Sequence, residues 1–180
     1  MTTHIVLLRA IGPVTHRLMR MQQWRDACAE AGYGAPQTHL ATGNMLLESD
    51  EDAPAIEQRM AAILAGFGLP AGVVPVVRTP GELSLVLAAN PFADAAETRR
   101  DALAGFFAKE RADFSWVAAH KDEERVHIVD DRHLVVDYPM QISKARLVPA
   151  VIERRSGVAL TARNWNTISA LVSHAAKRNT

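Results

Sequence analysis

The strongest constraint on the fold comes from two segments that are apolar at successive positions. They are the run Ile5 to Leu8 and the paired valines within residues 73–77. A strand with one face in water alternates apolar and polar residues, so strands that are apolar throughout need cover on both faces. We therefore predict that the second face of this sheet is covered by the other half of the chain or by a partner subunit.

The first half shows an order of elements that belongs to a known arrangement. Apolar spacing and turn residues predict strands at 4–11, 38–41, 45–48 and 73–79, with helices at 18–31 and 54–67. A loop is expected at 12–15. The order β-α-β-β-α-β is that of a ferredoxin-like sheet. Pro75 favours an edge position for the last strand, because proline cannot donate a ladder hydrogen bond.

The second half repeats this order more loosely. A short helix at 81–89 and a polar connector at 93–101 lead into it. Strands are predicted at 102–108, 125–129, 133–138 and 158–162, a weak helix at 111–119, and helices at 143–155 and 164–177. The predicted fold class is α+β, with two ferredoxin-like (βαββαβ) halves packed together and an extra C-terminal helix. The predicted domains are residues 1–92 and 93–180.

Composition narrows the partners and the cellular compartment. The chain has 20 basic and 20 acidic residues, and this balance argues against general nucleic-acid binding, which uses a basic excess. The expected central strands lack Phe, Tyr and Trp, which argues against RNA stacking on the sheet face. Cys28 is the only cysteine, the start of the chain lacks a secretion signal, and the apolar runs are too short for a membrane. We predict a cytoplasmic protein with no membrane partner, and the oligomeric state stays open.

One candidate ligand site follows from the predicted topology of the first half. The end of the first strand lies beside the start of the third, so Arg9 and Gly12 approach Thr42, Gly43 and Asn44. An arginine fork and a glycine that permits close backbone approach favour a small anionic or polar ligand. The alternative is that residues 43 and 44 form an ordinary turn and that Arg9 binds neighbouring carbonyls.

A second candidate site lies in the other half. The third and last strands and the helix at 143–155 bring together six polar residues: Tyr138, Ser143, Lys144, Arg163, Asn164 and Asn166. Ser143 is expected to cap the helix, whose start with Lys144 nearby favours anions. In the alternative, Asn164 caps the last helix, Trp165 packs in the core and Lys144 is solvated.

No metal site, cofactor or catalytic set is predicted. The seven histidines include no pair at metal-binding helical spacing, although His127 and His133 sit on neighbouring strands. Cys28 is interpreted as a core residue, and residues 122–124 as a solvated acidic loop. Neither a phosphate-binding glycine loop nor a Gly-x-Ser-x-Gly elbow occurs.

Several short motifs resemble a bacterial family known as domain of unknown function 1697 (DUF1697). They are the opening Leu-Leu-Arg-x-Ile at 7–11, a Thr-Gly-Asn turn at 42–44, Asn-Pro-Phe at 90–92, Tyr-Pro at 138–139, Ser-Lys at 143–144 and the closing stretch 161–167. The resemblance implies a two-part α+β fold and no established activity. Residues 12–15 and 140–142 replace glycine-rich segments of the family. If those glycines wrap an anion, this chain lacks part of that cradle.

The leading functional hypothesis is therefore a protein that binds a small anionic or nucleotide-like ligand. It rests on the polar residues that gather at the two sheet ends. The alternatives are a transferase or hydrolase acting on a small polar substrate, and a protein-interaction module suggested by the strands that are apolar on both faces.

Overall fold

The computed structural model describes residues 1–178, which form two compact units. The N-terminal unit comprises Met1–Pro80 together with the end of the chain from His174, and the C-terminal unit comprises Gly81–Ser173. The predicted halves, 1–92 and 93–180, describe a repeat of element order and stay a prediction. Among the described residues, no helix is both long and apolar enough to cross a membrane.

The N-terminal unit contains a four-stranded antiparallel sheet. Its strands are β1 (Thr2–Leu8), β2 (Gly34–His39), β3 (Asn44–Ser49) and β4 (Pro75–Arg78), in the order β2-β3-β1-β4. This is the predicted ferredoxin-like order. Pro75 lies on an edge strand, as its missing N–H group requires.

Three helices connect these strands: α1 (Pro13–Leu18), α2 (Met21–Glu30) and α3 (Ala53–Gly66). The predictions of a loop at 12–15 and of a single helix at 18–31 were wrong in detail. Pro13 opens α1, where proline is tolerated because the first helical N–H has no partner in the helix. The chain then breaks at Met19, whose extended backbone (φ −144°, ψ 114°) separates α1 from α2.

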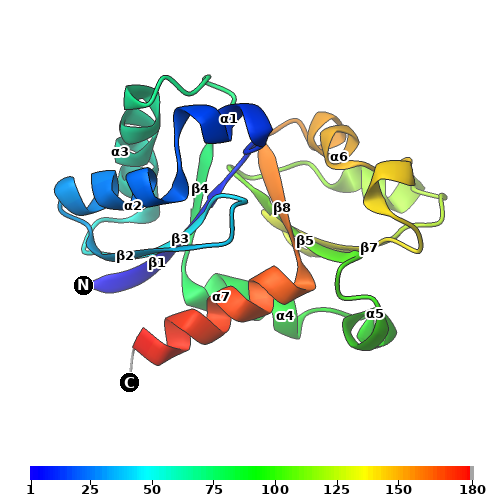
Figure 1. Cartoon of the computed structure of the whole chain (residues 1–180). Helices are drawn as coiled ribbons and strands as arrows, with labels where there is room; N and C mark the ends of the chain where they lie inside the picture. The colour runs from blue at the N-terminus through cyan, green and yellow to red at the C-terminus, as the bar shows by residue number, and fades with distance from the viewer. Residues whose placement is uncertain (179–180) are drawn as a thin grey trace. The chain divides into compact units, whose positions relative to one another are not determined.

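The core of the N-terminal unit lies between α2, α3 and one face of the sheet (Figure 1). Trp24 and Cys28 of α2 pack there with Met60 of α3, as was predicted for the cysteine. Ile5 and Leu7 point to the other face of β1 and are also fully buried. Both faces of β1 are thus covered, as its apolar sequence predicted.

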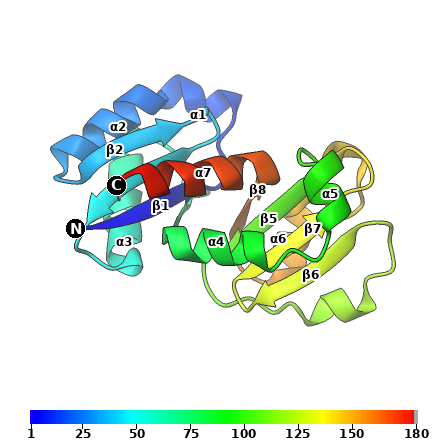
Figure 2. The same ribbon diagram turned by 90° about the horizontal axis from the view of Figure 1, so that it is seen from below.

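The C-terminal unit repeats the sheet. Its strands are β5 (Leu103–Ala108), β6 (Arg125–Asp130), β7 (His133–Asp137) and β8 (Leu160–Asn164), in the order β6-β7-β5-β8 and again fully antiparallel. Figure 2 shows β5, β7 and β6 running side by side. The fold class, α+β with two ferredoxin-like halves and a C-terminal helix, is confirmed. The elements from residue 80 on are α4 (Pro80–Ala88), α5 (Ala93–Thr98), β5 (Leu103–Ala108), the 3-10 helix η1 (Ser115–Ala119), β6 (Arg125–Asp130), β7 (His133–Asp137), the 3-10 helix η2 (Ile142–Lys144), α6 (Pro149–Ser156), β8 (Leu160–Asn164) and α7 (Trp165–Arg178).

Three predictions for this unit need correction. The expected connector at 93–101 contains α5, and the expected weak helix at 111–119 is the short 3-10 helix η1. The expected helix at 143–155 begins only at Pro149. Val148 is extended (φ −66°, ψ 157°), because the residue before a proline avoids the helical region.

Two buried arginines mark the correspondence between the two sheets. Arg78 pairs with Ile5 across β4 and β1, and Arg163 pairs with Gly105 across β8 and β5. Each arginine donates Nη1 to the carbonyl of the residue before it, at 2.8 Å in both cases. The same side-chain arrangement at the same register position shows that the repeat extends beyond element order.

Candidate functional site

The first predicted site is brought together in part. The N–H of Leu8 donates to the carbonyl of Gly43 (2.8 Å), so the end of β1 lies beside the β2–β3 turn as expected. Arg9 donates Nη1 to the carbonyl of Gly72 (2.7 Å). Asn44 is fully buried and donates Nδ2 to the carbonyl of His39 (2.9 Å) and to Oγ1 of Thr42 (3.0 Å). These bonds are those of the alternative interpretation, a braced turn and an arginine bound to a backbone carbonyl.

Gly12 and Gly43 have separate structural roles. The N–H of Gly12 donates to Oγ1 of Thr15 (2.8 Å) at the start of α1. Gly43 has a positive φ of 81°, and a Cβ there would come within 2.8 Å of the Leu8 Cβ. Glycine is therefore required at this turn for close backbone packing.

Most of the second predicted set holds the fold together. Tyr138 is buried and donates its hydroxyl to the carbonyl of Leu147 (2.8 Å). Asn164 accepts a hydrogen bond from the N–H of Thr167 (3.0 Å) and so caps α7. Trp165, the first residue of α7, is buried, as the alternative interpretation predicted.

Arg163 and Asn166 also bond to the protein. Arg163 donates Nη1 to Oγ1 of Thr161 (2.7 Å), and burial lowers the pKa of Arg163 to about 10. Asn166 accepts Nε of Arg100 (2.7 Å) and donates to Oδ1 of Asp101 (2.8 Å). These contacts place Asn166 in a surface network that anchors the start of α7.

Ser143 and Lys144 lie in η2 and are exposed. The prediction that Ser143 caps the following helix was wrong, because η2 ends at Lys144 and α6 begins at Pro149. Lys144 does line a pocket of about 460 Å³. The other lining residues are Lys121, Asp122, Glu123, Glu124, Met140 and Arg146.

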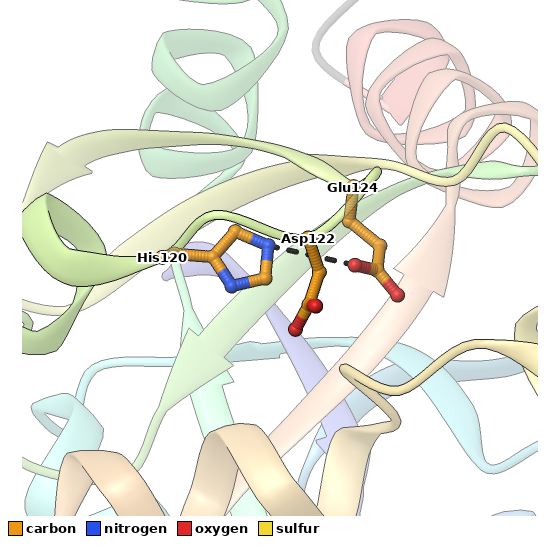
Figure 3. Close-up of side chains that lie close together, drawn as sticks. All are labelled: His120, Asp122 and Glu124. Atoms are coloured by element: carbon orange, nitrogen blue, oxygen red, sulfur yellow. Dashed lines mark ion pairs between the residues drawn. The ribbon is translucent and has the colours of Figure 1, made fainter.

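A cluster of three potential metal ligands adjoins this pocket. His120, Asp122 and Glu124 lie on the segment between η1 and β6, and each offers one ligand atom within 4.8 Å of the others (Figure 3). The His120 Nε2 lies 3.5 Å from the Glu124 Oε2. His120 is extended (φ −68°, ψ 126°) and the chain then bends at 122–124, so the three side chains gather within five positions of the sequence.

Glu124 is fixed from one side by the loop after η2. Its Oε1 accepts the backbone N–H groups of Arg146 (3.1 Å) and Leu147 (3.2 Å). Burial by itself raises the pKa of Glu124, but backbone N–H groups and the neighbouring His120 lower it, and the balance holds this pKa below its usual range. Glu124 is only 4% exposed, so the prediction of a solvated acidic loop was wrong for this residue.

Three buried polar atoms of His120 and Glu124 have no hydrogen bond within the described residues. The His120 side chain is 5% exposed, and neither ring nitrogen has a hydrogen-bond partner among residues 1–178. The same holds, within the described chain, for the Glu124 Oε2. A buried polar group left unpaired costs about 1–3 kcal/mol, so a group of this kind is expected to bind a water molecule or an ion.

The donor set suits a divalent transition metal. Imidazole nitrogen and carboxylate oxygen bind Zn²⁺ at about 2.0–2.2 Å, which places neighbouring ligand atoms about 3.3 Å apart in a tetrahedral site. The separation of 3.5 Å between His120 and Glu124 is close to that value. The cluster was not predicted from the sequence, because it contains a single histidine and therefore no pair at metal-binding spacing. The signal was one histidine followed at two-residue intervals by two carboxylates.

The family profile described as "Protein of unknown function (DUF1697)" matches residues 1–134. The chain belongs to the DUF1697 family. The match to DUF1697 includes all three residues of the His120 cluster, whereas Lys144 lies beyond it. No curated protein matches this DUF1697 chain.

A solved structure shares the fold of this DUF1697 protein. It is the conserved bacterial protein SP0830 from Streptococcus pneumoniae, with a TM-score of 0.71 and 14% sequence identity. The superposition covers 97% of this chain and 98% of the other. At this identity the likeness shows the fold alone.

Proposed function

We propose that this DUF1697 protein binds a divalent transition metal ion through His120, Asp122 and Glu124. The observation that carries the proposal is the buried His120 ring, which has no hydrogen bond in the described chain and faces a buried carboxylate oxygen that also lacks one. Nitrogen and oxygen donors of this kind favour Zn²⁺ over Mn²⁺, and Mg²⁺ is disfavoured because it prefers oxygen ligands and water.

Three protein ligands leave part of the coordination shell for another molecule. Structural zinc sites use four protein ligands, whereas catalytic and ligand-binding sites keep an open position. Asp122 is the exposed member of the cluster and also lines the pocket, so the open side faces that pocket. We therefore propose a functional rather than a structural metal.

The cytoplasmic location stays a prediction.

A purely structural role is the competing explanation. His120 would then pair with Glu124 to hold the segment before β6 in place, with no metal ion involved. Trp116 supports this packing, since its ring meets that of His120 edge-on with centroids 6.2 Å apart. The two explanations differ in what they predict for metal titrations.

The test is isothermal titration calorimetry of chelator-treated protein with Zn²⁺, Mn²⁺ and Mg²⁺. We expect one Zn²⁺ per chain, weaker Mn²⁺ binding, and at least roughly tenfold weaker Zn²⁺ binding in His120→Ala and Glu124→Gln. The matched controls are His127→Ala, a histidine outside the cluster, and Glu123→Gln, the neighbouring carboxylate that is not a member of it.

Circular dichroism and melting temperatures show which variants are folded. A wild-type protein that takes up no Zn²⁺, or a folded His120→Ala variant with wild-type Zn²⁺ affinity, would overturn the proposal. Binding of Co²⁺ gives a second readout, because its visible absorption spectrum depends on the coordination number and geometry of the bound ion.

A further inference from the structure

We infer that the pocket beside the His120 cluster binds the phosphate group of a small molecule when the metal is in place. This inference rests on the proposed metal site and names the ligand class that the site would take. It starts from the position of Lys144, which lines the same pocket as two members of the cluster, Asp122 and Glu124.

The charges of the pocket make anion binding conditional on the metal. Three cationic side chains (Lys121, Lys144 and Arg146) and three carboxylates (residues 122–124) line it, so its formal charge is zero. An anion entering this pocket alone would meet the Glu124 carboxylate. A divalent ion held by two of the carboxylates adds two positive charges and turns the pocket into an anion site.

Metal binding also frees a cationic side chain. Arg146 Nη1 lies 3.6 Å from the Asp122 Oδ1, and the Arg146 side chain is 85% exposed. An Asp122 carboxylate that coordinates an ion is a weaker partner for that guanidinium. Arg146 then becomes available for a phosphate, which its planar fork of donors suits.

Backbone hydrogen bonds hold the segment that carries Lys144 and Arg146 next to Glu124, the proposed metal ligand. The N–H groups of Arg146 and Leu147 both donate to the Glu124 Oε1, which leaves Oε2 for the ion. Lys144 stands at the end of η2, two residues before Arg146. In the described part of the chain its ammonium group has no ion-pair partner, so it is free to contact a ligand.

The size of the pocket and its charge pattern together favour a phosphate on an organic carrier. A volume of about 460 Å³ is within the usual range for small-molecule sites. Metal ions that bridge phosphate oxygens beside lysine and arginine side chains recur in phosphate-binding sites. Met140 gives the pocket an apolar wall for the carrier.

The test uses ribose 5-phosphate, inorganic phosphate and ribose, titrated calorimetrically into zinc-loaded and chelator-treated protein. We expect ribose 5-phosphate to bind the loaded form at least roughly tenfold more tightly than the metal-free form, with ribose not binding. Inorganic phosphate binding as tightly as ribose 5-phosphate would support the phosphate site and identify the free ion as its ligand.

Variants separate the ligand site from the metal site. Lys144→Gln and Arg146→Gln should each weaken ribose 5-phosphate binding about fivefold or more and leave Zn²⁺ affinity within about twofold. The matched control, Arg154→Gln, removes a positive charge from the exposed surface of α6 and should change neither affinity.

The outcomes are distinguishable from failure of the metal proposal. If Zn²⁺ binds at the cluster but ribose 5-phosphate binds loaded and metal-free protein equally, or not at all, the phosphate site is refuted and the metal site stands. If Zn²⁺ does not bind, both fail. Equal ribose 5-phosphate affinity of Lys144→Gln, Arg146→Gln and wild type would also overturn the inference.

Discussion

Gly105 of β5 lies directly against Ile168 of α7. A Cβ built on Gly105 would come within 2.6 Å of the Ile168 Cδ1 and 3.3 Å of the Val86 Cγ1, so α4 and α7 both meet the sheet here. The equivalent position of the N-terminal sheet, which pairs with Arg78 as Gly105 pairs with Arg163, is occupied by Ile5. The absence of a side chain at Gly105 thus adapts the repeated sheet to its terminal helix.

Replacing Gly105 with alanine should destabilise the protein. The added methyl group displaces the Ile168 side chain in a filled core, which costs about 1–3 kcal/mol of unfolding free energy. Urea denaturation followed by circular dichroism measures this change. The matched control is Gly66→Ala in α3, where a Cβ meets nothing within 4 Å and alanine should be neutral or stabilising. Equal stability of both variants would show that α7 does not pack closely on Gly105.

Replacing Asn164 with alanine should weaken the start of α7. The Asn164 side chain accepts the N–H of Thr167, and losing such a cap costs about 0.5–2 kcal/mol. Asn164→Asp keeps an acceptor and places a negative charge at the helix start, so it should retain wild-type stability. The difference between the two variants in thermal melts measures the contribution of the cap. A similar loss in both would mean that the amide group acts in another way.

Cys28 should resist thiol reagents in the native protein. Its side chain is fully buried, and burial raises the pKa of the thiol to about 12, so the reactive thiolate is scarce at neutral pH. Labelling with a maleimide followed by mass spectrometry should show an unmodified chain under native conditions and one adduct in guanidinium chloride. Native labelling at the denatured rate would contradict the packing of α2.

His39 should make stability depend on pH. Burial and the nearby His174, whose ring centroid lies 5.1 Å away, lower the pKa of His39. The folded protein then binds this proton less readily than the unfolded chain. The stabilising contribution is complete above the ordinary histidine pKa of about 6.5 and is lost as the pH falls through that value toward the folded pKa.

The measurement is the unfolding free energy of wild type and His39→Gln between about pH 7.5 and about pH 5, a range that brackets the ordinary histidine pKa of about 6.5. The wild type should lose stability more steeply on acidification than the variant. His16→Gln is the control histidine of the same unit and should keep the wild-type slope. Identical slopes in wild type and His39→Gln would rule out this coupling.

Local sequence patterns predicted most of the elements and the order of the two sheets. The apolar runs of β1 and β4 predicted buried strands, and the helical spacing at 54–67 and 164–177 predicted α3 and α7 to within one residue at each end. The boundaries that were wrong depend on one or two residues. The extended backbone of Met19 separates α1 from α2, and the proline at 149 moves the start of α6 from the predicted residue 143 to residue 149. In both cases the backbone conformation of one residue overrides the helical spacing of the apolar residues.

The predicted ligand residues show the limit of topological reasoning. The strand order placed Leu8 and Gly43 together as expected, but it could not specify which groups Arg9 and Asn44 would bond. Arg9 and Asn44 both donate to backbone carbonyls, of Gly72 and His39 respectively. Carbonyl groups in loops and turns need hydrogen-bond donors, and the tertiary structure determines which side chains supply them.

The sequence by itself determined the α+β class, the repeated strand order and the burial of both faces of β1, because these follow from periodicity along the chain. Tertiary structure alone decided the surroundings of His120 and Glu124. The N–H groups of Arg146 and Leu147, 22 and 23 positions away in the sequence, donate to Glu124, and the ring nitrogens of His120 are buried. Burial of a polar group depends on residues distant in sequence, so no local pattern specifies it.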